Sequence, residues 1–203
     1  MCKDSDNAVA NAFFLTFADI NRERSTQAMN DTTNDTTQPI VDRLTMAMIE
    51  FDRGDAMRIQ HFLKVHRFAQ LIARMEHVDA HTQLVTEMAA VVHDIGIHPS
   101  EAKYGDCNGP HQEELGPAYA RQMLTGLGVD SSDVERVCYL VGHHHTYSNI
   151  LGTDYQILVE ADFLVNILED NMPADNVHTV MQRIFRTDTG KRLCQLQFKQ
   201  HKA

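Results

Sequence analysis

Histidine and aspartate side chains stand beside or inside apolar segments at four places in this sequence. These places are His61, the pair His93-Asp94, the run His143-His144-His145, and Asp162. Imidazole nitrogens and carboxylate oxygens are the ligands that Zn, Mn, Fe or Co take at a hydrolytic or redox centre. None of the four cysteines falls in these places, so no soft thiolate joins the set. The mixture favours a catalytic metal site over a structural one.

The setting of two aspartates sharpens this prediction. Asp94 closes the apolar segment MAAVVHDIG, and Asp162 lies inside the apolar segment LVEADFLVNIL. An ionised carboxylate in such surroundings is costly unless a counter-charge lies near it. A shared cation would supply that charge, and side chains that converge from facing helices can build such a site.

The elements that must position these side chains are helices. Apolar residues recur at spacings of three and four from Pro39 to the C terminus, and no segment alternates with period two. We therefore expect an all-α fold of about six to eight helices, with a metal site in the helical core. The expected helices run from Pro39 towards Gly54, from Asp55 to about Glu76, from about His81 to Ile95, from about His111 to Leu127, from Ser132 to the triple histidine, from about Tyr155 to Glu169, from Pro173 to Phe185, and briefly after Gly190. Ser132 and Glu135 form a predicted capping box, and residues 98–110 are predicted to be a surface loop.

Composition limits the class of protein. The chain has 203 residues and a formal net charge of −10, which argues against binding duplex nucleic acid. Residues 1–38 are predicted to be a flexible appendage and polar linker, and residues 39–203 one domain. No apolar run approaches the roughly 20 residues that span a bilayer. The cysteine spacing suggests reduced thiols. We therefore expect a cytoplasmic protein with no membrane partner.

From about Asp55 to Asn171 the sequence resembles the HD-domain superfamily of metal-dependent phosphohydrolases. The motifs that carry the resemblance are His61-x-x-x-Val65-x-x-x-Ala69, the segment AAVVHDIG that ends at Gly96, and Glu160-Ala161-Asp162. The resemblance implies that His61, His93, Asp94 and Asp162 hold one metal, and that Asp94 bridges to a second metal where one is present.

The same resemblance implies further ligands for a second metal. His111, His143 and His144 are the candidates, with His145 as an alternative within the run. The cofactor would be one or two divalent ions among Mn, Fe, Zn, Mg, Co and Ni. The HDIG segment is followed by Ile97-His98 instead of Gly-Lys, and no GYP motif follows the histidine run. Both departures argue against cyclic di-GMP as the substrate.

The expected reaction is hydrolysis of a phosphomonoester or phosphodiester, with a small phosphorylated molecule such as a nucleotide as substrate. Asp94 would take part in catalysis, His98 or His145 could protonate the leaving oxygen, and Lys103 could reach a phosphate. Two alternatives stay open. One is a di-iron oxygenase that cleaves a C–C or C–P bond, and the other is a non-catalytic signalling or binding module. The substrate, the metal and the oligomeric state are not determined by the sequence.

Overall fold

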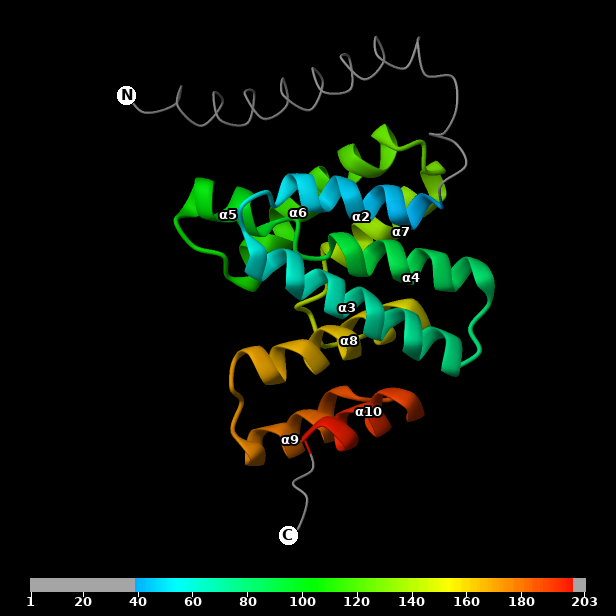
Figure 1. Ribbon diagram of the computed structural model, residues 1–203, viewed down its shortest axis with the longest axis vertical. Coiled ribbons are helices and arrows are strands. Elements are labelled where there is room, and N and C mark those ends of the chain that lie inside the picture. Colours follow the sequence, from blue (N-terminus) through cyan, green and yellow to red (C-terminus); the bar gives the residue numbers. More distant parts are fainter. Residues whose placement is uncertain (1–38, 199–203) are drawn as a thin grey trace. The chain divides into compact units, whose positions relative to one another are not determined.

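The computed structural model describes residues 39–198, and within this range the chain forms helices α2 to α10 and no strand (Figure 1). The all-α class expected from the periodicity is confirmed. The predicted appendage, residues 1–38, lies outside the described residues. The described residues from Ile40 to Phe198 belong to one compact unit. No helix in the described range combines the length and the apolar character needed to cross a membrane.

Helix α4 is the centre of the fold. The helices are α2 (Ile40–Phe51), α3 (Ala56–Met75), α4 (Ala80–Val92), α5 (Ile97–Tyr104), α6 (Gly109–Gly126), α7 (Ser131–Val141), α8 (Thr153–Glu169), α9 (Ala174–Ile184) and α10 (Asp188–Phe198). Helix α4 packs against α2, α3, α7 and α8, and its residues from Val85 to Val92 are all buried. Helices α9 and α10 pack on α8 (Figure 1). The residues at the end of α4 are therefore surrounded by side chains from several helices.

Local signals in the sequence explain where α3 begins. Gly54 adopts a φ of +94°, which an L side chain rarely takes, and it ends the segment after α2. Asp55 then caps α3, because its carboxylate accepts a hydrogen bond from the backbone N–H of Arg58 at 3.1 Å. Both features agree with the helix boundary expected from the sequence.

The prediction of a surface loop over residues 98–110 is wrong in its first half. Residues Ile97–Tyr104 form α5, which packs against α6. Pro99 lies in the first turn of α5, where a helix tolerates a missing N–H, and Gly105 ends the helix at a φ of +77°. Pro99 and Gly105 are therefore boundary residues of a short helix, and Gly109 and Pro110 are the first residues of α6.

Two other boundaries differ from the predictions. The capping box is absent, because α7 begins after Asp130, and the carboxylate of Glu135 instead accepts a hydrogen bond from Arg121 of α6 at 2.8 Å. Helix α10 begins at Asp188, so Gly190 lies within it. A Cβ at position 190 would overlap the carboxylate of the buried Glu160, which explains why glycine fits there.

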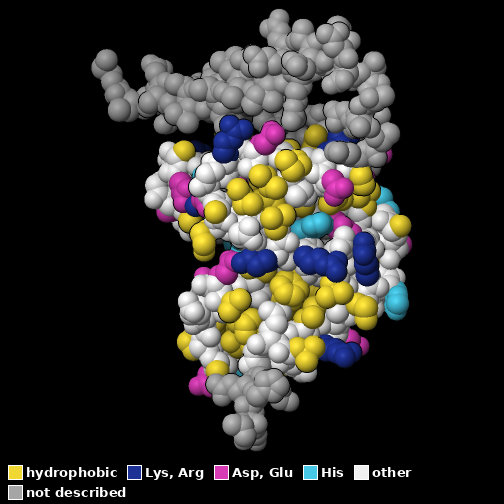
Figure 2. Space-filling view, in the orientation of Figure 1, with side chains coloured by type: hydrophobic (Ala, Val, Ile, Leu, Met, Phe, Trp, Pro, Cys, Tyr) yellow, Lys and Arg dark blue, Asp and Glu magenta, His cyan; other side chains and the backbone are white. Residues whose placement is uncertain are grey.

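Helix α3 is basic although the chain as a whole is acidic. It contains no Asp or Glu, and its cationic residues are Arg58, Lys64, Arg67 and Arg74. Figure 2 shows Lys and Arg side chains in a row across the middle of one face, where α3 lies in Figure 1. Of these, Arg58 and Lys64 lie one turn before and one turn after His61, and both form ion pairs with carboxylates.

Candidate metal centre

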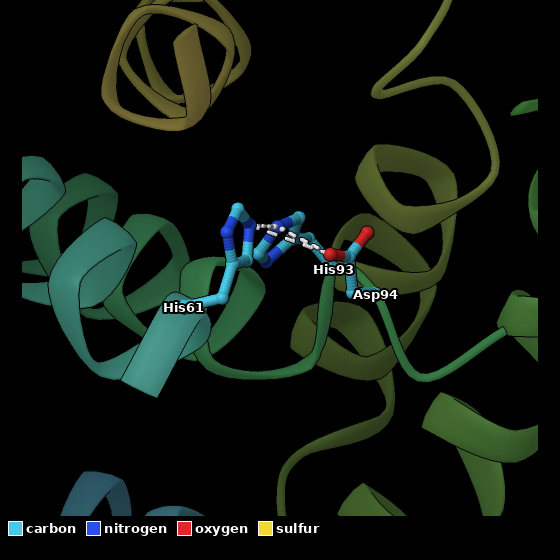
Figure 3. Close-up of side chains that lie close together, drawn as sticks. All are labelled: His61, His93 and Asp94. Carbon is cyan, nitrogen blue, oxygen red and sulfur yellow. Dashed lines mark hydrogen bonds and ion pairs between the residues drawn. The ribbon is translucent and has the colours of Figure 1, made fainter. Parts of the chain in front are cut away.

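The structure brings together four of the predicted side chains from three helices. His61 lies on α3, His93 and Asp94 follow α4, and Asp162 lies on α8. Nε2 of His61 is 3.3 Å from Nε2 of His93 and 3.2 Å from Oδ1 of Asp162. Oδ2 of Asp94 is 3.4 Å from Nε2 of both histidines (Figure 3). Two nitrogens and two carboxylate oxygens therefore face one point.

The second nitrogen of each ring is already engaged. Nδ1 of His93 donates to the carbonyl of Ala90 at 2.9 Å, and Nδ1 of His61 donates to Oε2 of Glu169 at 2.7 Å. These bonds place a ring proton on Nδ1, so Nε2 is the nitrogen of each ring that is available to bind an ion. Two lone pairs and two carboxylates at one point repel one another unless a cation or protons lie between them. His61, His93 and Asp94 thus form a donor group that fits a metal ion.

The pKa values of these groups reflect the same crowding of acids and imidazoles. Burial lowers the pKa of His61, but the hydrogen bond with Asp162 and the charge of Asp94 outweigh it and raise the pKa to about 9. Burial raises the pKa of Asp162, but its hydrogen bonds with His61 and His93 outweigh this and hold the pKa well below its usual range. The carboxylates are therefore ionised, and they attract positive charge to this point.

A second donor group shares Asp94 with the first. Nε2 of His144 lies 3.3 Å from Oδ1 of Asp94, and Nδ1 of His144 donates to the carbonyl of Val141 at 2.8 Å. His145 completes the group. Its Nε2 is buried and has no hydrogen-bond partner, which is costly for a polar atom and fits a ligand of an ion. The group Asp94, His144 and His145 can therefore hold another cation.

Two predicted histidine ligands lie outside both donor groups. His111 points to the loop that precedes α6, where its Nδ1 lies 2.8 Å from Asp106. His143 stacks on Tyr139, with ring centroids 4.1 Å apart, and its Nδ1 donates to the carbonyl of Tyr139 at 2.7 Å. Of the histidine run, the structure therefore brings His144 and His145 to Asp94.

The two loop residues predicted to assist catalysis have other partners. Lys103 donates to Glu114 at 3.1 Å and lies 4.6 Å from the centroid of the Tyr104 ring. Nδ1 of His98 accepts a hydrogen bond from Arg58 at 2.8 Å, and Nε2 of His98 faces the buried Asp52 at 3.4 Å. Both nitrogens of His98 are thus engaged.

The sequence reasoning did not identify Asp52, Arg58 or Glu169. Burial raises the pKa of Asp52 to about 7, and the charge of Arg58 only partly opposes this. Glu169 lies two helical turns after Asp162 on α8, a spacing that places both on one face. That periodicity could have indicated Glu169 as a partner of the site. No comparable spacing indicated Asp52, since it follows the end of α2.

Comparisons with known proteins agree with the motifs. A family model described as "HD domain" matches residues 58–183. A crystal structure of a predicted HD superfamily hydrolase from an uncultured Thermotogales bacterium is similar, with a TM-score of 0.56 and 26% identity over 77% of this chain and 84% of that chain. No curated protein matched the chain. The resemblance seen in the sequence is thereby confirmed.

Proposed function

The chain belongs to the HD-domain family, and on that premise we propose that it is a metal-dependent phosphohydrolase. Its substrate is a phosphomonoester or phosphodiester of a nucleotide, and water is the nucleophile. One divalent ion would be held by His61, His93, Asp94 and Asp162, and a second by Asp94, His144 and His145.

The position of Asp94 carries this proposal. Its Oδ2 faces Nε2 of His61 and His93 at 3.4 Å each, while its Oδ1 faces Nε2 of His144 at 3.3 Å. A carboxylate whose two oxygens face different nitrogen groups can bridge two cations. Paired divalent ions at a hydrolytic site activate water and neutralise the charge of a phosphate.

The residues around the ligands keep them in place. Glu169 accepts from Nδ1 of His61 at 2.7 Å and also receives a hydrogen bond from Lys64. Asn166 donates to Oδ1 of Asp162 at 2.9 Å. Such partners fix the orientation of a ligand and raise its basicity.

His98 has a positioning role in this proposal. Burial and the charge of Arg58 lower its pKa, so the ring is neutral near pH 7. Because Nδ1 accepts from Arg58, the remaining proton is on Nε2, directed at Asp52. The one ring proton of His98 is therefore engaged with Asp52 and not with a leaving group, and His98 links α5 to the segments that precede it. We assign His145 to metal binding for a similar reason, since burial and the charge of His144 lower its pKa to about 4.

The test combines metal analysis with phosphate release. The full chain is purified, its metal content is measured by elemental analysis, and hydrolysis of bis-p-nitrophenyl phosphate and a panel of nucleotides is followed with Mn²⁺. We expect phosphate-ester cleavage by the wild type and none by Asp94→Ala. Thermal shift of the wild type and of Asp94→Ala compares their metal binding, because an ion that binds only the native state raises the melting temperature of the protein that binds it.

Three results would contradict the proposal. Equal cleavage by the wild type and Asp94→Ala would show that another site, or a contaminant, is responsible. Bound iron with substrate-dependent O₂ uptake and no phosphate release would indicate an oxygenase. A wild type that neither contains metal nor is stabilised by Mn²⁺, Zn²⁺ or Fe²⁺ would indicate a binding module.

A further inference from the structure

An exposed aromatic side chain lies beside the candidate metal centre. Tyr147 follows the histidine run and is 43% exposed. Its hydroxyl lies 3.5 Å from Nδ1 of His145, and its ring packs on Phe163 with the centroids 5.0 Å apart. Phe163 directly follows Asp162. Both rings are therefore attached to segments that carry donor atoms of the site, and neither ring has a role in holding a metal.

Hydrogen bonds to side chains of α6 and α8 hold the segment that leads to Tyr147. The carboxylate of Glu113 on α6 accepts hydrogen bonds from the backbone N–H of His145 at 2.9 Å and from Oγ1 of Thr146 at 3.0 Å. The hydroxyl of Tyr155 on α8 lies in hydrogen-bond contact with the carbonyl oxygens of His143 and Thr146. The backbone that leads to Tyr147 is thus held in place, and the ring itself packs on Phe163. A preorganised ring loses little conformational entropy when it binds.

We propose that Tyr147 and Phe163 form an aromatic surface that binds the planar base of a nucleotide whose phosphate lies at the metal centre. This inference rests on the proposed function and names the residues that would select its substrate. Stacking on an aromatic side chain tolerates any base, since every base has a π-face. The surface would therefore favour nucleotides over phosphate esters that lack a base, with little preference among the bases.

The two phosphates adenosine 5′-monophosphate and ribose 5-phosphate test this, because they differ only by the base. Their dissociation constants are measured by isothermal titration calorimetry with the Mn²⁺-loaded full chain, under conditions in which neither phosphate ester is cleaved during the titration. We expect the wild type to bind the nucleotide about tenfold more tightly or better. Tyr147→Leu and Phe163→Leu should reduce this ratio several-fold, whereas Tyr147→Phe, which keeps the ring, should retain it.

A matched control is available in Tyr104, which is 36% exposed, stacks on His111 and belongs to neither donor group. Tyr104→Leu should leave the ratio of the two dissociation constants unchanged. Equal binding of both ligands by the wild type would overturn the inference, and so would an unchanged ratio in Tyr147→Leu. Loss of the ratio in Tyr147→Phe would overturn it as well, because the hydroxyl would then be the binding group. If the ratio holds while no phosphate ester is cleaved, the inference stands and the proposed hydrolase function fails.

Discussion

Nε2 of His144 lies 3.3 Å from Oδ1 of Asp94, although the two residues are 50 positions apart in the chain. Asp94 follows the central helix α4, and His144 follows α7, which packs on α4. The packing of these two helices thus brings one imidazole of the histidine run to the carboxylate. Its neighbour His143 is directed to Tyr139 instead.

Separate substitutions of His143 and His144 should distinguish the residue that stacks on Tyr139 from the residue that binds metal. We expect His144→Ala to lower Mn²⁺-dependent hydrolysis by roughly 100-fold or more, because it removes a proposed metal ligand. Loss of a residue that only hydrogen-bonds to a ligand costs about 10- to 100-fold. His143→Ala should stay near the wild-type rate, since it loses a stacking contact with Tyr139 and no donor atom of the site. Steady-state kinetics and metal content are measured for both. Equal losses in the two variants would refute this assignment.

Glu169 should influence the metal centre without binding a metal. Its Oε2 accepts from Nδ1 of His61 at 2.7 Å. Glu169→Gln removes the charge that orients His61, so we expect metal affinity to fall by about 10- to 100-fold while the fold persists. Titration of the metal-free chain with Mn²⁺ measures the affinity, and circular dichroism checks the helix content. Unchanged affinity would mean that the contact is structural only.

Gly96, the last residue of HDIG, should not tolerate a side chain. A Cβ at this position would lie 2.6 Å from the carbonyl oxygen of Gln112 in α6, and backbone cannot move aside cheaply. We expect Gly96→Ala to lower the free energy of unfolding by about 1–3 kcal/mol, the range for overpacking. Urea unfolding measures it.

Gly126 is the control for this substitution. It lies in α6, and a Cβ there would meet nothing within 4 Å. Gly126→Ala should raise the free energy of unfolding by about 0.5–1 kcal/mol, because alanine loses less backbone entropy on folding. If both variants are destabilised alike, the steric argument for Gly96 is incorrect.

Glu87 should make stability depend on acid pH. Its carboxylate joins α4 to α3 by accepting from His66 at 3.0 Å and from Gln70 at 2.8 Å, and it also accepts from Gln83 of its own helix at 2.6 Å. Burial raises the pKa of Glu87, but the hydrogen bonds from His66 and the glutamines outweigh it and lower the pKa to about 2, from 4.5. As the pH falls through this window the unfolded chain takes up the proton first, so stability is lost.

The Glu87→Gln variant isolates this effect. Near pH 7 it should be about 2 kcal/mol less stable than the wild type, the size of a buried hydrogen bond to a charge. The difference should shrink as the pH falls from about 4.5 towards 2, which urea unfolding at several pH values measures. Glu135→Gln, at an exposed ion pair with Arg121, should show little change. A difference between Glu87→Gln and the wild type that does not vary with pH would contradict the prediction.

The sequence by itself determined the helical class and the core of the candidate site. Apolar spacing set the helices, because a helix must bury one face, and the isolated carboxylates of Asp94 and Asp162 in apolar segments indicated a shared cation. The tertiary structure brought these two residues together with His61 and His93, as the sequence predicted. His61 and Asp162 lie on buried helix faces, His93 and Asp94 directly follow α4, and the family resemblance implied that all four hold one metal.

Only the tertiary structure decided which histidines accompany Asp94 in the second group. His143, His144 and His145 are consecutive, and the turn after α7 directs each ring differently, so periodicity cannot distinguish them. His111 was also a reasonable candidate, but its ring pairs with Asp106 in the preceding loop. Side chains at helix ends and in loops take their direction from contacts between segments distant in sequence. A pattern of residue types does not contain those contacts.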